Sequence, residues 1–194
     1  EPVKRSNVND KDMHKRKSNM ATKSEAFRED VIQPVLKAMD LYSLAAEELL
    51  LGTAVQESLH FTYRTQMGGG PAKSYFQMEP ATHDDIWNNF LRYKTALADK
   101  VIATLTAPDA DKIEELENND FYAAAMARVH YYRVPKALPD AGDVTEQARY
   151  WKRYYNTVLG KGKVSEYVEK WELFVADVHR DGSPRAEPEP IAAD

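Results

Sequence analysis

The sequence predicts a mainly α-helical fold with a small loop or β-hairpin near residues 64–78. Two observations support this prediction. Apolar side chains recur at the three- and four-residue spacing of amphipathic helices along most of the chain, whereas alternating runs of β-branched residues are few. Between Met67 and Met78, three successive glycines and a proline interrupt the pattern, and such a run forbids a regular helix.

The first two helices are predicted on either side of residue 40. An amphipathic segment at residues 25–39 is expected to bend or break near Pro34, because an interior proline removes a backbone donor. Ser43 can cap the next helix, which runs to Glu57. This second helix is mostly apolar, so we expect it at the centre of the fold.

Four further helices are expected downstream. Thr82 with Asp85 makes a capping-box-like start for a helix that continues through Phe90 and Tyr93 to Val101. Helical spacing predicts the other three, one of them capped by Asp143, at residues 121–132, 144–158 and 164–178.

The chain length suits one domain flanked by two tails. With 194 residues, 43% of them hydrophobic, the chain can bury a single core, which we place at residues 24–180. Residues 1–23 hold seven Lys or Arg and three acids, and this basic segment is expected to be flexible. Residues 181–194 are rich in Pro, Glu and Ala, and are expected to be disordered.

The composition disfavours several classes of function. There is no cysteine, and His60, His83 and His130 are too scattered for a metal site, so we expect neither metal nor cofactor. The net charge of −5 makes nucleic acid an unfavourable main partner. No stretch approaches the roughly 18 apolar residues that span a bilayer, and the first residues lack the apolar core of a signal peptide.

Glu57 and Ser58 stand where the apolar central helix ends, before the glycine-rich turn. A carboxylate at such a place is fixed by the helix and can face a cleft. Taken alone, a helical glutamate is more often a solvated surface group. The functional interpretation of Glu57 therefore depends on its sequence neighbours.

Those neighbours form ordered motifs over about residues 44–168. Residues 54–58 read Ala-Val-Gln-Glu-Ser, and residues 80–82 read Pro-Ala-Thr after Gln77. Residues 154–157 read Tyr-Tyr-Asn-Thr, with two glycines shortly after. The set resembles the catalytic domain of soluble lytic transglycosylases and goose-type lysozymes, which has a Glu-Ser, a Leu-Met-Gln with Met-Pro-Ala-Thr, and an Ala-Tyr-Asn-Ala-Gly in this order. The chain departs from the family at two glycine positions, which hold Pro71 and Ser74.

The resemblance implies a lysozyme-like domain that cleaves the β-1,4 bond between N-acetylmuramic acid and N-acetylglucosamine in peptidoglycan. Glu57 is then the catalytic acid and base. The expected substrate-binding residues are Ser58, Gln77, Met78, Tyr155 and Asn156. Two outcomes stay open, namely hydrolysis with a second carboxylate and a single-glutamate reaction that gives a 1,6-anhydro product; the sequence slightly favours the second. Conceivable second carboxylates are Glu79, Asp84 and Asp85.

A structural protein is the alternative. Residues 77–86 and 151–162 look like stretches of uncharacterised phage proteins, so the chain is also interpreted as a virion structural or assembly protein with a lysozyme-like fold and little or no activity. Its location is then the phage virion or the bacterial cell wall, and the two terminal segments are the expected contacts with other virion proteins. A third possibility, a glycan- or peptide-binding module without turnover, applies if Glu57 cannot reach a cleft.

Overall fold

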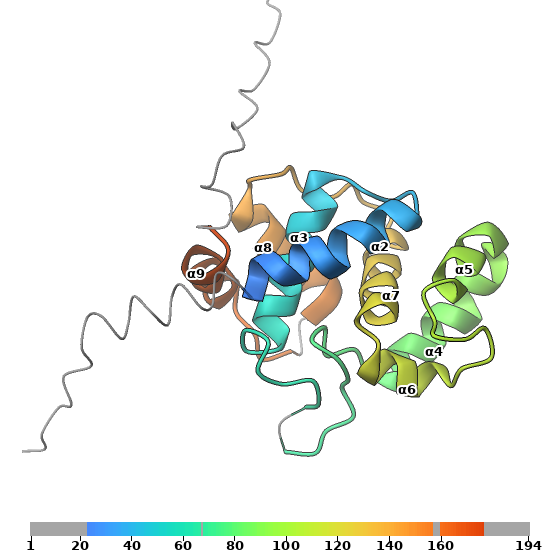
Figure 1. Cartoon of the computed structure of the whole chain (residues 1–194). Coiled ribbons are helices and arrows are strands. Elements are labelled where there is room, and N and C mark those ends of the chain that lie inside the picture. Colours follow the sequence, from blue (N-terminus) through green and yellow to red (C-terminus); the bar gives the residue numbers. More distant parts are fainter. Residues whose placement is uncertain (1–22, 67, 157–159, 177–194) are drawn as a thin grey trace, which may run out of the picture.

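The computed structural model describes residues 23–66, 68–156 and 160–176, and within these the protein is mainly α-helical with no strand (Figure 1). The loop after the second long helix holds two isolated antiparallel bridges, Thr65–Lys73 and Lys73–Met78. The predicted fold class and the loop near residues 64–78 are therefore confirmed. None of the described helices is long and apolar enough to cross a membrane. Apart from Lys23, the two predicted tails lie outside the described residues.

The first helical unit is irregular next to its proline. It passes through the π-helical turn η1 (Arg28–Ile32) into α2 (Gln33–Ala38), which has Pro34 in its first turn. The amide of Gln33 donates to the carbonyl of Arg28, five residues back. Because Pro34 has no amide hydrogen, the regular four-residue pattern cannot continue through it, and the helix widens just before it. The helix therefore does not break at Pro34 as one form of the prediction had it, and the irregularity is the π-helical turn before the proline.

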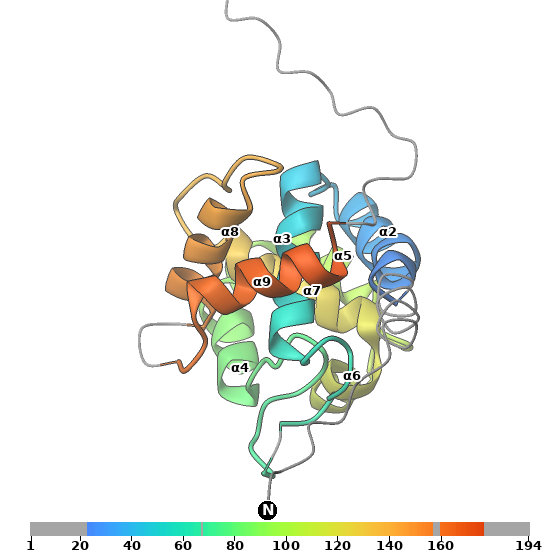
Figure 2. The same cartoon turned by 90° about the vertical axis from the view of Figure 1, so that its left-hand side faces the viewer.

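Helix α3 (Leu44–Glu57) is the buried centre of the fold, and its bounds agree with the prediction. The Ser43 side chain caps it by accepting a hydrogen bond from the Ala46 amide over 3.1 Å. Helix α9 (Val164–Phe174) crosses α3 closely (Figure 2). At the crossing, a Cβ on Gly52 would lie 2.0 Å from the Tyr167 hydroxyl oxygen, so the close approach requires glycine.

The helix predicted from Thr82 to Val101 is wrong in its start and its continuity. Helix α4 (Pro80–Asn89) begins two residues earlier, so Thr82 lies inside its first turn instead of capping it. The short helix η2 (Leu91–Tyr93) and helix α5 (Thr95–Ile102) follow as separate elements. Non-helical backbone at Phe90 and Lys94 turns the chain, and Tyr93 is 70% exposed.

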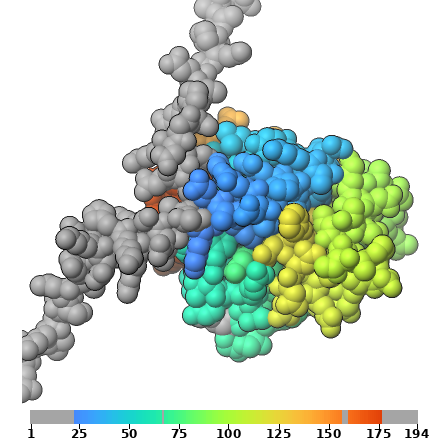
Figure 3. Space-filling model, viewed as in Figure 1, coloured from blue at the N-terminus to red at the C-terminus, as the bar shows by residue number. Residues whose placement is uncertain are grey.

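Helix α7 (Asp120–Tyr132) joins the two halves of the molecule. On one side it contacts α2 and α3, and on the other it contacts α4, α5 and α6 (Lys112–Asn118), a helix that the periodicity did not predict (Figure 1). The space-filling view shows the N-terminal helices and the loop after α3 on one part of the surface and the α4–α6 region on another (Figure 3).

The chain then returns to α3 through α8 (Val144–Trp151) and the π-helical turn η3 (Lys152–Asn156). Asp143 caps α8 by accepting from the Glu146 amide, which confirms the predicted helix start. The predicted end of this helix, residue 158, lies outside the described residues. The ends of α3, α8 and η3 are the elements that build the candidate site.

Candidate active site

The Glu57 carboxylate lies where three helical elements end. Glu57 is the last residue of α3, Trp151 the last of α8 and Asn156 the last of η3. The indole Nε1 of Trp151 donates to Glu57 Oε1 over 2.9 Å, and the Asn156 side chain adds a second hydrogen bond to the same carboxylate. Helix termini therefore hold the acid and both of its donors on rigid elements.

Burial raises the pKa of Glu57 to about 7, from its ordinary value of 4.5. Removal from water disfavours the charged carboxylate, and this effect exceeds all the opposing ones. The opposing effects come from the Trp151 and Asn156 hydrogen bonds and from the positive charges of Lys170 and Lys152. A carboxyl group with this pKa exchanges its proton near neutral pH, so it can act both as an acid and as a base.

Lys152 fixes the orientation of Asn156. Its Nζ donates to Asn156 Oδ1 over 2.8 Å and to the Gly160 carbonyl over 2.7 Å. Because Oδ1 accepts from the lysine, the amide Nδ2 is the atom that faces the carboxylate as a donor. A side chain at Gly160 would begin 2.3 Å from Asn156 Oδ1, so glycine permits this arrangement.

Gly162 lets the chain approach Trp151 closely, as Gly160 does at Asn156. A Cβ at this position would lie 2.5 Å from the end of the Trp151 ring. The two glycines that follow the Tyr-Tyr-Asn motif thus let the chain pack against both donors of Glu57.

Tyr155 lies within electrostatic reach of Glu57. Burial and the nearby Glu57 charge raise the pKa of its phenol well above the usual value. Its hydroxyl donates to the Phe76 carbonyl over 2.8 Å, which ties η3 to the loop after α3. The Tyr131 ring packs 5.2 Å from the Tyr155 ring, and its own pKa is raised by burial, with Glu57 among the smaller causes. Tyr155 and Asn156 therefore come together with Glu57.

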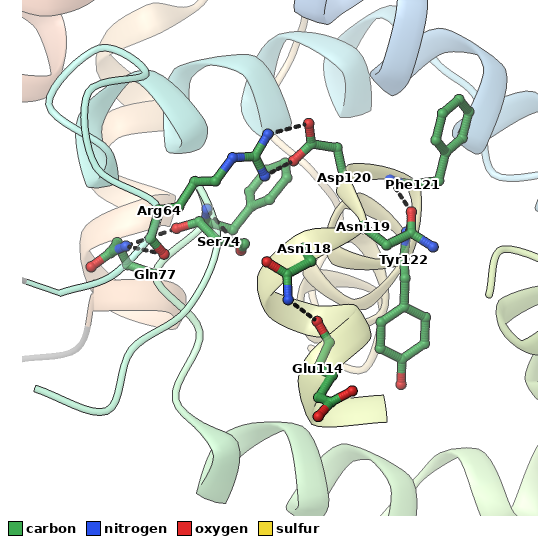
Figure 4. Close-up of polar contacts among 10 residues, drawn as sticks. Arg64, Ser74, Gln77, Glu114, Asn118, Asn119, Asp120, Phe121 and Tyr122 are labelled. Carbon is green, nitrogen blue, oxygen red and sulfur yellow. Dashed lines mark hydrogen bonds and ion pairs between the residues drawn. The ribbon is translucent and has the colours of Figure 1, made fainter. Parts of the chain in front are cut away.

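Gln77 braces the loop from within. Its Nε2 donates to the Ser74 carbonyl over 2.7 Å and to the Arg64 carbonyl over 3.4 Å (Figure 4). Arg64 in turn forms a two-bond ion pair with Asp120 at the start of α7 (Figure 4). Gln77 follows the residue whose carbonyl receives the Tyr155 hydroxyl. Its contact with substrate stays a prediction, whereas its two hydrogen bonds show that it stabilises the loop.

Ser58 and Met78 hold structural positions instead of the predicted substrate contacts. The Ser58 side chain is buried, and its hydroxyl donates to the Ala54 carbonyl over 2.6 Å and accepts from the Phe61 amide over 2.5 Å. It closes the end of α3 and has no surface to offer a ligand. Met78 is 3% exposed and belongs to the hydrophobic core.

The chain that leaves Glu57 follows a left-handed turn. Three successive non-glycine residues, Leu59, His60 and Phe61, have φ of 47°, 59° and 57°. Such conformations cost about 1–2 kcal/mol per residue for L-amino acids. Strain of this kind persists only where the surroundings hold it, and it concentrates at functional sites.

Three residues of the site were missed at the sequence level: Trp151, Lys152 and Lys170. The helical spacing of Trp151 indicated a core residue, and it is indeed fully buried. A buried indole N–H needs an acceptor, and Trp151 lies four residues before Tyr155, which is a signal that could have identified it. Lys170 comes from α9, and nothing local in the sequence relates it to Glu57.

The described residues contain no group of three or more His, Cys, Asp or Glu that could hold a metal ion. A carboxyl group whose pKa lies near 7, as that of Glu57 does, can take part in proton transfer. Comparison of the chain with protein-family models, with curated proteins and with solved structures finds no match.

Proposed function

We propose that this chain is a peptidoglycan-cleaving enzyme with a lysozyme-like fold, in which Glu57 is the single catalytic carboxylate. The observation that carries the proposal is the Glu57 carboxyl group, whose pKa burial raises to about 7 while two N–H donors fix it in place. The ordered Glu-Ser, Gln with Pro-Ala-Thr, and Tyr-Tyr-Asn motifs support it, since Glu57, Tyr155 and Asn156 lie together.

In the first step, protonated Glu57 donates its proton to the glycosidic oxygen as that bond breaks and positive charge develops on the sugar. The carboxylate that remains accepts hydrogen bonds from Trp151 and Asn156 and lies in the field of Lys170 and Lys152. These four groups favour the charged form, so they stabilise the intermediate state of the enzyme.

In the second step, the same carboxylate takes a proton from the attacking hydroxyl group. A pKa near neutrality suits both steps, because the group must release and regain one proton in each cycle. When the attacking group is the muramyl 6-hydroxyl, the product is a 1,6-anhydro sugar.

The surroundings of Glu57 favour this single-glutamate reaction over one with two carboxylates. The charged groups that act on the pKa of Glu57 are both lysines. The three alternative acids have other settings: Asp84 bonds to His83, Asp85 pairs with Arg133, and Glu79 is exposed. We therefore propose a lytic transglycosylase that acts at the bacterial cell wall, with delivery by a phage virion as part of the same proposal.

The test is digestion of purified peptidoglycan sacculi by the wild type, Glu57→Gln and Glu79→Gln. The two variants make the same chemical change, one at the buried site and one on the surface. We expect release of muropeptides by the wild type and Glu79→Gln and none by Glu57→Gln. Mass spectrometry then separates anhydro-muramyl ends, which indicate a transglycosylase, from reducing ends, which indicate hydrolysis. No release by a folded wild type would contradict the proposal and favour the structural virion protein.

A further inference from the structure

His130 stands next to the Glu57 site without a part in the reaction described above. It lies near the end of α7, and its ring packs edge-on against Tyr155 with 4.9 Å between the ring centroids. Its Nδ1 lies 3.2 Å from Nη2 of Arg133. Arg133 is held in turn by Asp85 of α4, over 2.5 Å from Nη1 to Oδ2. The cluster thus links α4, the end of α7 and η3.

Arg133 determines which nitrogen of His130 carries the proton. A guanidinium group has donors only, so Nδ1 of His130 must be the acceptor in this contact. The neutral ring then carries its hydrogen on Nε2. Burial and the Arg133 charge lower the pKa of His130 to about 4, while Asp85 opposes this, so the ring is neutral at physiological pH.

Among the described residues, none forms a hydrogen bond with the Nε2–H group. A neutral donor beside the Tyr155 ring is suited to an uncharged oxygen acceptor. The glycan of peptidoglycan carries such an acceptor on every sugar, the carbonyl oxygen of the acetamido group.

We infer that His130 is a substrate-binding residue whose Nε2–H donates to an acetamido carbonyl oxygen of the glycan strand, beside the sugar that Glu57 attacks. Arg133 and Asp85 are its positioning residues. The inference rests on the proposed function for the identity of the substrate. The tautomer and the binding of an acetamido sugar can be measured without any turnover.

The first experiment is ¹⁵N spectroscopy of the imidazole side chains, with His130→Gln used to assign the signals. We expect His130 to be neutral with its proton on Nε2 between pH 6 and 8. Titration with hexa-N-acetylchitohexaose should shift its Nε2 signal, and titration with the de-acetylated hexamer should not. A proton on Nδ1, a charged ring, or no difference between the two sugars would overturn the inference.

The second experiment compares His130→Phe with His130→Gln in the sacculus assay. Phenylalanine keeps the packing against Tyr155 and removes the donor, whereas glutamine supplies an amide N–H near the place of Nε2. We expect His130→Phe to lower kcat/KM about 5- to 10-fold, mainly through KM, in line with one lost hydrogen bond, and His130→Gln to restore most of it. Equal activity of the wild type and both variants would refute the inference. If the wild type releases nothing, the proposed function falls, and the spectroscopic titration still decides whether His130 binds the sugar.

Discussion

Replacement of Glu57 by Gln should stabilise the protein at alkaline pH and lose that advantage in acid. Burial raises the pKa of Glu57 from 4.5 to about 7, so the folded state holds this proton more tightly than the unfolded state. The wild type therefore has its full stability below pH 4.5, where Glu57 is protonated in both the folded and the unfolded state. It loses stability as the pH rises from 4.5 through 7, because the unfolded state releases this proton more readily. Glutamine, which carries no charge, does not follow this dependence.

The magnitude follows from the size of the shift. Each pKa unit corresponds to about 1.4 kcal/mol, so a shift from 4.5 to about 7 changes the free energy of unfolding by about 3 kcal/mol between pH 4 and pH 8.5. The glutamine amide lies beside the Asn156 amide and forfeits one hydrogen bond, which costs about 1 kcal/mol at every pH. That constant offset cancels when the wild type and Glu57→Gln are compared at two pH values.

The assay is urea unfolding of the wild type, Glu57→Gln and Glu79→Gln from pH 4 to pH 8.5. We expect the stability difference between Glu57→Gln and the wild type to grow by about 3 kcal/mol over this range. The surface variant should follow the wild type closely. A difference that stays constant with pH would refute the reasoning, because it would mean that Glu57 titrates in the folded protein as it does in the unfolded chain.

Three further predictions test the supports of the site. Trp151→Phe removes a donor to the charged form of Glu57, so the pKa of that carboxyl group should rise by about one unit in a ¹³C titration; an unchanged pKa would contradict the assigned hydrogen bond. Gly52→Ala should destabilise the protein by about 3 kcal/mol in urea, because its Cβ would meet the Tyr167 hydroxyl, and Tyr167→Phe should recover part of the loss. Ser74→Ala should cost about 1 kcal/mol through a lost hydrogen bond, whereas Ser74→Gly should be nearly neutral; equal losses would refute this account.

The sequence predicted best those elements whose limits are set by neighbouring residues. Ser43 and Asp143 bind the first amides of their own helices, so their side chains mark the starts of α3 and α8 without reference to the rest of the fold. The continuous helix from Thr82 to Val101 failed for the opposite reason. Its apolar residues keep helical spacing across the break, so their pattern does not reveal the non-helical backbone at Phe90 and Lys94 that turns the chain there.

The same distinction applies to the site. The predicted juxtaposition of Glu57 with Tyr155 and Asn156 came from motif order, because no local pattern relates residues about 100 positions apart. Ser58 was misjudged because a serine that follows a catalytic acid and a serine that closes a helix look alike in sequence, whereas the structure shows its hydroxyl bonded to the Ala54 carbonyl. Lys170 reaches Glu57 only through the crossing of α9 over α3.

Ser74 stands where the proposed family has a glycine, and this bears on whether the loop can serve the proposed site. Ser74 has a φ of 64°, the left-handed conformation for which glycine is the usual choice. Its hydroxyl accepts a hydrogen bond from the Phe76 amide over 3.2 Å, which supports the turn that glycine would form without help. Phe76 in turn presents its carbonyl to the Tyr155 hydroxyl beside Glu57. Serine at position 74 therefore supports this left-handed turn and its link to Tyr155, and it is compatible with the proposed catalysis at Glu57.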